Sequence, residues 1–360
     1  MKIFNIVLSL ILLTKYEKPR HHILPNEVPA YILYDYTSDQ ILYQKNIKKI
    51  VYPASITKIL TCMVVFDEIK KNNLNLNDEF VVSKKADKTE GTTMFLKENE
   101  KVSVENLLKG TIAQSGNDAA TTLAEGLFKT EKDFVVKMNQ KAQALNMESS
   151  KFVNCTGLPD KNHYTSVHDL LKLCKSLISN YPDFYQHFGM ASFRWNNITQ
   201  YNKNSSLYSK KLKNQNIFID GIKTGYTSMS LNTHTLSGYK QVKIYNLKID
   251  QEGKIDLQEE IIDRRLIGIT MGHVSKKTRK IESERLLLLG FTKFNVLKFQ
   301  NEYKININDK IYKFKFNRKY LAIKSNIELD KITLKIKKNS NSISGNLIIS
   351  DKNILVAQLI

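Results

Sequence analysis

The chain has 360 residues, with 55 lysines and arginines against 35 aspartates and glutamates, and its net charge is +20. At roughly 150 residues per domain this length predicts two domains. A hydrophobic share of 42% with 25% charged residues excludes a chain that is disordered throughout. The charge would suit a nucleic-acid partner. However, 7 of the 55 cations are arginines, which leaves 55 − 7 = 48 lysines, and lysine lacks the planar fork that reads bases and phosphates. The excess is therefore typical of a solvated surface, and we expect no specific nucleic-acid partner.

Cysteine usage argues against a covalent or metal framework. Cys62, Cys155 and Cys174 are too few and odd in number for a set of disulfides. One internal disulfide is compatible with the sequence, and three free or buried thiols are favoured. There is no CxxC pair and no cysteine–histidine pair at zinc spacing, so we expect no metal and no cofactor.

The N-terminus has the pattern of an export signal. Lys2 precedes the apolar run 3–13, IFNIVLSLILL, which is well short of the ~20 residues that span a bilayer. No small-residue cleavage site follows. We expect residues 1–15 to be a signal or N-terminal membrane segment, with a buried first strand as the alternative. The proline-containing residues 16–26 are predicted to be a linker.

After the linker, the first predicted elements are a hairpin and then helices. Alternating apolar residues predict two strands, at 30–36 and 40–43. Helical spacing of apolar residues follows in four segments, 55–71, 104–128, 130–145 and 167–179. The last helix has a capping pattern formed by Ser166 and Asp169.

Strands return from residue 218 onward. A long hairpin is predicted from 233–249 and 255–270, and a helix over 282–289 that ends at Gly290. After about residue 293, apolar and polar residues alternate with a period of two, as in 312–316 and 332–336. The chain thus predicts an α+β domain, whose sheet is completed by distant segments, followed by a small all-β domain.

The tetrapeptide SITK begins a predicted helix at Ser55. A spacing of three residues places Ser55 and Lys58 on one helix face, one turn apart. Serine is a poor nucleophile until a base removes its proton, and a lysine whose pKa is lowered by burial can be that base. The same spacing recurs at Ser237 and Lys240, which we attribute to chance. Residues 53–54, Pro-Ala, and the helical pattern that follows set Ser55 apart.

A second pattern lies between helical stretches at Ser115 and Asn117. A hydroxyl there can relay a proton to a leaving amine, and an amide can hold both Lys58 and a substrate carbonyl. The same tripeptide recurs at residues 344–346, where a β-turn is favoured.

A third pattern, Lys223-Thr224-Gly225, follows the strand-like residues 218–222. Lys223 would supply a positive charge and Thr224 a hydroxyl for an anionic substrate group. A glycine lets a substrate backbone lie against the strand edge. Taken alone, each of the three patterns is also compatible with a surface lysine, a turn or a helix cap.

In this order, Ser-x-x-Lys, Ser-x-Asn and Lys-Thr-Gly are the signature of the serine penicillin-recognising enzymes. Among these the chain resembles the D-alanyl-D-alanine carboxypeptidases, the low-molecular-mass penicillin-binding proteins of peptidase family S11. The resemblance covers about residues 27–292 and, more loosely, the β domain. It is carried by segments 53–61 (PASITKILT), 114–120 (QSGNDAA), 152–154 (FVN), 156–159 (TGLP), 220–227 (DGIKTGYT) and 279–291 (RKIESERLLLLGF).

The resemblance implies a serine β-lactamase/penicillin-binding-protein-like transpeptidase fold, with a sheet beside a helical region and a small all-β C-terminal domain after it. Residues 27–292 would be the catalytic domain and 293–360 the β-rich domain. The implied activity is removal of the terminal D-alanine from peptidoglycan stem peptides, in cell-wall biosynthesis and remodelling. β-Lactam antibiotics would be acylating inhibitors. The implied location is the periplasm or cell envelope, at the outer face of the cytoplasmic membrane, with membrane association.

The resemblance also implies a role for each motif residue. Ser55 would be the nucleophile that forms the acyl-enzyme, and Lys58 its general base. Ser115 and Asn117 would serve proton transfer and substrate orientation.

The remaining implied roles concern substrate binding. Lys223 and Thr224, aided by Arg279, would face the terminal carboxylate of the substrate. The oxyanion hole would be formed by the backbone N–H groups of Ser55 and Tyr226.

Four features depart from the family pattern. Lys203 stands where many members carry arginine, which keeps the charge but loses bidentate geometry. Residues 228–232 lack the expected glycine, and the hairpin around 245–263 is longer than usual. Residues 354–356 are strand-like, so a C-terminal anchor helix is not expected and the N-terminal segment would be the tether.

A class A β-lactamase is the alternative within the same superfamily. It would need a deacylating glutamate between the second and third motifs. Glu125, Glu131 and Glu148 lie in that interval, but none has asparagine four residues later. The carboxypeptidase interpretation is therefore favoured.

Overall fold

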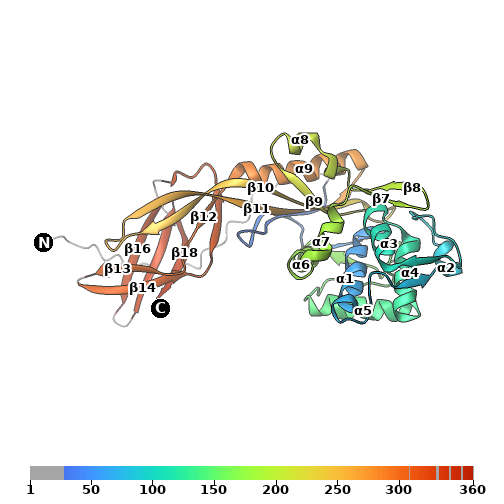
Figure 1. The fold of residues 1–360 in the computed structure, drawn as a ribbon. Coiled ribbons are helices and arrows are strands. Elements are labelled where there is room, and N and C mark those ends of the chain that lie inside the picture. Colours follow the sequence, from blue (N-terminus) through green and yellow to red (C-terminus); the bar gives the residue numbers. More distant parts are fainter. Residues whose placement is uncertain (1–27, 308, 330–331, 340–341, 350–351, 360) are drawn as a thin grey trace.

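The computed structural model describes residues 28–307, 309–329, 332–339, 342–349 and 352–359. The predicted signal or membrane segment (1–15) and the linker (16–26) lie outside the described residues. Figure 1 shows an elongated molecule with a helical region at one end and a β-rich region at the other. Two long strands, β10 (Leu231–Ile249) and β11 (Ile255–His273), run between them.

A seven-stranded sheet forms the centre of the protein, in the order β15-β12-β10-β11-β1-β2 with β9 paired to β10. The other strands of this sheet are β1 (Ala30–Asp35), β2 (Gln40–Lys45), β9 (Phe218–Thr227), β12 (Phe294–Lys298) and β15 (Tyr320–Lys324). Strand β1 pairs antiparallel with β11, so the first and last parts of the helical region share one sheet. This confirms the predicted α+β fold with a sheet completed by distant segments.

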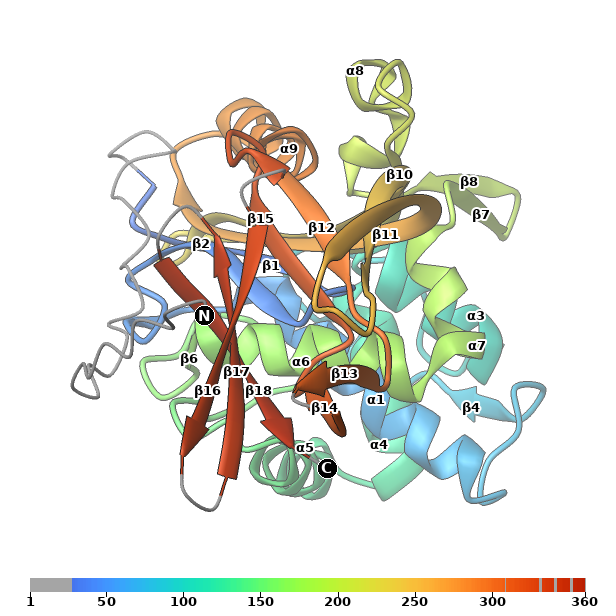
Figure 2. The ribbon, with the colours of Figure 1, turned by 90° about the vertical axis from the view of Figure 1, so that its left-hand side faces the viewer.

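Helices cover both faces of this sheet, as Figure 2 shows. Their bounds are η1 (Ala54–Ile56), α1 (Thr57–Lys70), α2 (Lys84–Asp87), α3 (Val104–Lys109), η2 (Gly110–Gln114), α4 (Asn117–Phe128), α5 (Glu131–Ala144), α6 (Val167–Asn180), α7 (Pro182–Tyr185), η3 (Gln186–Gly189), η4 (Ser205–Tyr208), α8 (Lys210–Lys213) and α9 (Lys276–Lys293). One hydrophobic core joins α1 and α6 to Ile32, Ile267 and Ile269. A second core, on the opposite face, joins α9 to Leu33 and Leu266.

Short strand pairs supplement the helical region. They are β3 (Ile50–Val51) with β6 (Thr165–Ser166), β4 (Glu79–Val81) with β5 (Lys101–Ser103), and β7 (Ser192–Trp195) with β8 (Ile198–Tyr201). Helix α1 lies at the centre of this region, because every residue from Thr57 to Phe66 is buried. A helix that is buried around its whole circumference is a core helix, so its N-terminal turn is held rigidly.

The last helix, α9, corrects one sequence-based expectation. We predicted a helix over 282–289 that ends at Gly290, but α9 spans Lys276–Lys293 and Gly290 lies inside it. Ser275 caps its N-terminus by accepting from the Thr278 backbone N–H at 3.0 Å. A Cβ at position 290 would lie 2.5 Å from Leu266 Cδ1, so this glycine allows the helix to pack closely on the sheet. The polar residues 276–280 gave no apolar periodicity from which the first turns could be predicted.

The C-terminal region is all β, as expected. Its five-stranded sheet has the order β13-β14-β18-β17-β16, with β13 (Tyr303–Ile307), β14 (Lys310–Phe316), β16 (Ile332–Asn339), β17 (Ser342–Ile349) and β18 (Lys352–Leu359). The hairpin of β10 and β11 extends into its core, where Leu247 packs with Phe314. Tyr303 Oη also donates to the Leu247 carbonyl at 2.9 Å. The domain boundary at 292/293 stays a prediction, and β12 and β15, which follow it, pair with the central sheet.

A buried ion pair links the central strands to the end of α9. Arg264 on β11 is 1% exposed and Asp35 on β1 is fully buried. Arg264 donates to Asp35 Oδ2 from Nε at 2.9 Å and from Nη2 at 2.8 Å. Its Nη1 donates to the Phe294 carbonyl, at the junction of α9 and β12. All three bonds keep the buried charges satisfied.

Breaking this pair should destabilise the fold strongly. We expect Arg264→Ala to lower the free energy of unfolding by about 3–5 kcal/mol, because it leaves a buried carboxylate without its partner. Urea denaturation measures the loss. The matched control is Lys243→Ala on the same hairpin, since Lys243 and Glu259 form an exposed pair at 2.8 Å, and exposed pairs contribute about 0–1 kcal/mol. Equal losses in the two variants would contradict the assignment.

Candidate active site

The first motif lies at the start of the buried helix α1. Ala54 has a left-handed backbone (φ 50°), and the short helix η1 that follows presents Ser55, which is half-buried, ahead of α1. Lys58 is fully buried one turn later. Its Nζ lies 3.1 Å from Ser55 Oγ, as the spacing of three residues predicts. The structure therefore brings the predicted nucleophile and base together.

Two further contacts fix the amine of Lys58. Nζ donates to Asn117 Oδ1 at 2.6 Å and to the Thr156 carbonyl at 2.7 Å. A neutral amine has two N–H donors and one lone pair. When both donors are used on these two acceptors, the lone pair remains for the Ser55 hydroxyl, which then donates to Nζ. This geometry suits proton transfer from serine to lysine.

Burial also adjusts the acidity of this lysine. Removal from water disfavours the charged ammonium and lowers the pKa of Lys58 to about 7, against weaker opposing effects of Cys155, Cys62 and Asp118. All three cysteines are free and buried, in agreement with the favoured prediction. At neutral pH a large fraction of Lys58 is therefore neutral and able to act as a base.

The second motif sits at a break between two helices. The predicted helix over 104–128 is divided into α3, the π-helical turn η2 and α4, and Ser115 at the break has φ 67°. Asn117 begins α4 and points its amide at Lys58, while its Nδ2 donates to the Glu90 carbonyl. Asp118 accepts from the backbone N–H groups of Met94 and Leu96. The break thus places Ser115 and Asn117 beside a loop anchored by Asp118.

The third motif lies on β9, the strand next to η1. In the β9–β10 register, Lys223 is opposite Thr235 and Thr224 is opposite His234. Because successive side chains of a strand alternate between faces, Lys223 and Thr224 point to opposite sides of the sheet. Lys223 is buried, and burial followed by the charge of Lys58 lowers its pKa well below the ordinary value. It therefore lies on the same side of the sheet as Lys58.

Gly225 shares that side of the strand and approaches the nucleophile turn. A Cβ at position 225 would lie 3.0 Å from Ala54 Cβ and 3.1 Å from the Pro53 carbonyl. Tyr226, the next residue, has a 60% exposed side chain. The edge of β9 is thus in contact with the segment that carries Ser55.

Two cations lie near Lys223 from outside the strand. Arg279, in the first turns of α9, and Lys203, before η4, both act to lower the pKa of Lys223. The backbone N–H of Lys203 donates to the Ala113 carbonyl, next to the second motif. The predicted substrate-binding residues therefore lie around β9. Lys203, which stands where many family members carry arginine, lies close to them.

Sequence reasoning missed several residues that hold this site. The Thr156 carbonyl binds Lys58, and Gly157 follows it with φ +83°. His163 Nε2 lies 2.8 Å from Thr57 Oγ1 and ties the loop to the start of α1. A backbone acceptor leaves no trace in residue type, whereas the pattern Thr-Gly at 156–157 was visible as part of the family resemblance.

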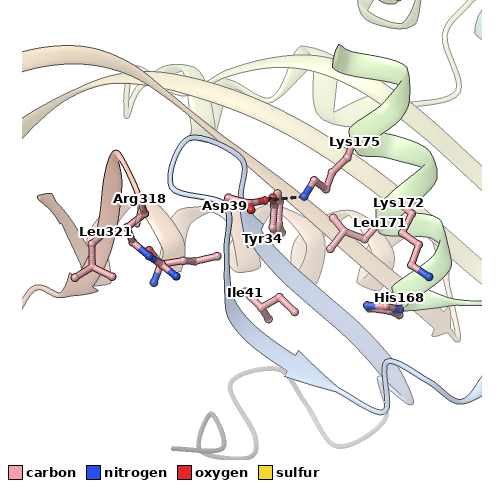
Figure 3. A pocket seen from close by; sticks show the side chains of 10 residues that line it. Tyr34, Asp39, Ile41, His168, Leu171, Lys172, Lys175, Arg318 and Leu321 are labelled. Atoms are coloured by element: carbon pink, nitrogen blue, oxygen red, sulfur yellow. Dashed lines mark hydrogen bonds and ion pairs between the residues drawn. The ribbon is translucent and has the colours of Figure 1, made fainter. Parts of the chain in front are cut away.

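A separate pocket lies away from these residues. It is lined by Tyr34, Asp39, Gln40, Ile41, His168, Leu171, Lys172, Lys175, Arg318 and Leu321. Figure 3 shows Lys175 directed at Asp39, with Nζ 2.7 Å from the carboxylate. Lys172 pairs with Asp169 at 3.2 Å. The pocket contains none of the three motifs. The candidate active site is therefore the one at Ser55, where the serine hydroxyl and the Lys58 amine are in contact.

Comparisons with known proteins agree with this arrangement. The family model for D-alanyl-D-alanine carboxypeptidase, peptidase S11, matches residues 20–244. The carboxypeptidase DacD of Escherichia coli K12 is 33% identical over 281 residues, which cover 76% of this chain and 66% of DacD.

Solved structures show the same fold. The D-alanyl-D-alanine carboxypeptidase DacD from Francisella tularensis matches with a TM-score of 0.75 and 25% identity, over 98% of this chain and 96% of that chain. Penicillin binding protein 5 from Haemophilus influenzae matches with a TM-score of 0.73 and 26% identity, over 94% and 98%. The central sheet, with Ser55 beside the buried Lys58, is thus of the penicillin-binding-protein class.

The chain belongs to the D-alanyl-D-alanine carboxypeptidase family, peptidase family S11. The resemblance inferred from the motifs is thereby confirmed. The matched region spans just under two thirds of the length of the curated relatives, at 66%, 63% and 65% of the first three.

Gly157 offers a test of how the nucleophile turn is held. A Cβ there would lie 1.9 Å from the Ala54 carbonyl oxygen, so we expect Gly157→Ala to displace the turn and to destabilise the fold by about 1–3 kcal/mol beyond the backbone strain. Gly253 is the matched control, because it has the same φ of +83° with nothing within 4 Å. Thermal or urea unfolding compares the two. Equal destabilisation would show that the contact with Ala54 is unimportant.

Proposed function

We propose that this protein is a serine-type D-Ala-D-Ala carboxypeptidase, which removes the terminal D-alanine from peptidoglycan stem peptides through an acyl-enzyme on Ser55. The observation that carries the proposal is the contact between Ser55 Oγ and a fully buried Lys58 amine at 3.1 Å. Family membership supports the reaction class.

In the acylation step, Ser55 Oγ attacks the carbonyl carbon of the penultimate D-alanine while Lys58 Nζ takes the hydroxyl proton. The carbonyl oxygen becomes an oxyanion, and the backbone N–H groups of Ser55 and Tyr226 are the proposed donors to it. Each preorganised donor of this kind contributes about 3–4 kcal/mol to transition-state stabilisation. The tetrahedral intermediate then collapses and the C–N bond breaks.

The leaving D-alanine amine needs a proton, which Ser115 is proposed to relay from Lys58. Asn117 orients the stem peptide while it holds Lys58 in place. Water then attacks the Ser55 ester, with Lys58 again accepting a proton, and the shortened peptide leaves. Ser55 and Lys58 return to their initial states, so no co-reactant other than water is used.

The exopeptidase preference is assigned to the charges around β9. Lys223, Thr224 and Arg279 are proposed to bind the terminal carboxylate, with Gly225 against the peptide backbone. Arginine can hold a carboxylate with two parallel hydrogen bonds. Lys203 adds charge without that fork.

The same proposal includes partners and location. The name of penicillin binding protein 5 from Haemophilus influenzae states that it binds penicillin, and we propose β-lactams as acylating inhibitors of this chain too. Export to the periplasm or cell envelope, with membrane association, is supported by Lys2 and the apolar run 3–13. Within the described residues, the helices are too short or too polar to cross a bilayer.

Acylation by a labelled penicillin tests the nucleophile. We expect Ser55→Ala to abolish both labelling and D-alanine release from a D-Ala-D-Ala peptide, because Ser55 Oγ is the hydroxyl that lies 3.1 Å from the buried Lys58 amine. Mass spectrometry of the acyl-enzyme locates the label. The control is Ser237→Ala, since Ser237 and Lys240 have the same spacing but lie on β10. Labelling that survives Ser55→Ala would overturn the assignment, and rapid turnover of the penicillin would favour a β-lactamase.

The pH dependence of acylation tests the base. Lys58 acts in its neutral form and has a pKa of about 7. We expect the second-order rate constant of acylation to rise about tenfold per pH unit below that value and to level off above it. Stopped-flow acylation between pH 5 and 9 measures the profile. A rate that stays flat from pH 5 to 7 would exclude Lys58 as the base.

A further inference from the structure

The sheet face covered by α9 carries buried polar side chains beside Thr224. In the β9–β10 register, His234 lies opposite Thr224 and Asn232 lies opposite Tyr226. Asn232 is also opposite His273, the last residue of β11. Directly opposed residues of an antiparallel pair project to the same face. Thr224, Asn232 and both histidines therefore share one face, away from Lys58.

This face is the one on which α9 lies. Thr270, which is opposite His234 on β11, has its hydroxyl 2.8 Å from Ser283 Oγ of α9. Arg279 is one turn before Ser283 on the same helix, and its charge contributes to the lowered pKa values of His234 and His273. The guanidinium and the two imidazoles therefore form a group next to Thr224.

Several atoms of this group have no hydrogen-bond partner among the described residues. They are Arg279 Nε, His234 Nδ1, His273 Nε2 and Asn232 Oδ1. The four side chains are all at least 94% buried, with exposures of 6%, 1%, 3% and 3%. Buried polar groups are almost always hydrogen-bonded, to protein, water or ligand. Four unpartnered atoms in one cluster indicate a polar subsite whose occupant is a ligand or ordered water.

Hydrogen bonding around Asn204 fixes the tautomer of His234. Asn204 Nδ2 donates to the Gly221 carbonyl at 3.1 Å, and its Oδ1 accepts from the Ser206 backbone N–H at 3.2 Å. The amide oxygen is thus assigned, and His234 Nε2, at 3.0 Å from it, must carry the hydrogen. In the neutral ring Nδ1 is then a bare acceptor, and protonation would convert it into a second donor.

The charged groups that face His234 all favour the neutral ring. Burial is the largest cause of its pKa lying well below the ordinary value, followed by Arg279 of α9, His273 of β11 and Lys223 of β9. Burial and then Arg279 lower the pKa of His273 to about 4. Lys203, from the segment before η4, also acts on Lys223 and extends the positive surroundings.

Two carboxylates of α9 form ion pairs with cations other than Arg279. Glu284 of α9 pairs with Lys280 at 3.2 Å and accepts from Ser209 Oγ. Glu282 lies 3.6 Å from Arg285. Neither acid contributes to the lowered pKa of the two histidines. An anion that enters the subsite would therefore be the group that offsets its cations.

We propose that His234 and His273 complete the anion subsite at Thr224 and Arg279, and that they take up a proton from solvent when a terminal carboxylate binds there. The proposal rests on the proposed function and adds two specificity-determining residues to it. The bound carboxylate offsets the charges that kept the imidazoles neutral. Protonation then provides a buried N–H that can donate to the bound anion.

The sign of the linkage follows from this. Ligand binding raises the pKa of the histidines, so proton uptake accompanies binding and affinity rises as the pH falls. If the pKa of His273 rises from about 4 to the ordinary value of about 6.5 in the complex, affinity increases about tenfold between pH 7.5 and 5.5. Lys58 can also take up a proton near pH 7. At pH 5.5 Lys58, with its pKa of about 7, is already largely protonated, so the low-pH part of the effect belongs to the histidines.

The experiment uses the full chain with Ser55→Ala, which cannot form the acyl-enzyme. Calorimetry in two buffers of different ionisation enthalpy gives the affinity and the protons taken up for an N-acylated peptide ending in D-Ala-D-Ala. Measurements at pH 5.5 and 7.5 are compared with those for the same peptide bearing a C-terminal amide. We expect about tenfold tighter binding at the lower pH, with proton uptake, for the carboxylate peptide alone.

Variants assign the uptake to the two histidines. His234→Gln keeps a donor for Asn204 Oδ1 but cannot titrate, and His273→Gln removes the second imidazole. We expect the double variant to lose the proton uptake that the carboxylate peptide shows at pH 5.5, while the contribution of Lys58 near pH 7 remains. His168→Gln, in the remote pocket of Figure 3, is the control. Thermal unfolding confirms that each variant is folded.

The outcomes separate this inference from the proposed function. When penicillin labels Ser55, three results would overturn the inference alone. They are peptide binding that is independent of pH, no detectable binding at pH 5.5, and proton uptake at pH 5.5 that survives the double variant. Absence of labelling at Ser55 would overturn the proposed function. If the carboxylate and amide peptides respond equally to pH, the subsite does not bind the terminal carboxylate.

Discussion

The burial of one lysine amine is the constraint around which the site is built. Lys58 is fully buried, and its Nζ has protein acceptors at 2.6 and 2.7 Å. A lysine in water would stay protonated at neutral pH, and a buried lysine without acceptors would destabilise the fold. The structure gives the Lys58 amine two neutral acceptors, which satisfy its hydrogen bonds without the negative charge that would keep it protonated. This explains why α1 is buried on all sides and why a break before α4 carries Asn117.

Successive side chains of β9 point to opposite faces of the sheet, and the two faces contact different groups. Lys223 and Gly225 face the nucleophile turn, whereas Thr224 faces Arg279 and His234. We therefore propose that bond making takes place on the Ser55 side, and that the terminal carboxylate binds at the strand edge, within reach of Lys223 on one side and Thr224 on the other. Since the strand twists only slightly per residue, both sides stay in register with a peptide lying along its edge.

The sequence predicted the order of elements well, because that order rests on local periodicity, and the structure brings the three motifs together. It was wrong about α9, whose first turns bury Arg279 and Ser283 instead of apolar residues. It also could not show that the Thr156 carbonyl binds Lys58, because a backbone acceptor is independent of residue type. The sequence also did not indicate the roles proposed for His234 and His273, for a related reason. An isolated histidine in a strand pattern carries no spacing signal, and only the cross-strand register places it opposite Thr224.

Two titrating groups on opposite faces of β9 would act on the reaction in opposite directions. Lys58 must lose its proton to serve as base, which favours pH values above about 7, whereas the proposed histidine subsite gains affinity below that. Both depend on the same positive field, because Lys223 contributes to the lowered pKa of His234 and is itself influenced by Lys58 and Arg279. A carboxylate that offsets the field would also raise the pKa of the lysines and so oppose deprotonation of the base. In the proposed subsite the histidines lie beside the carboxylate, and proton uptake there would reduce that opposition, because the proton would be taken up away from Lys58.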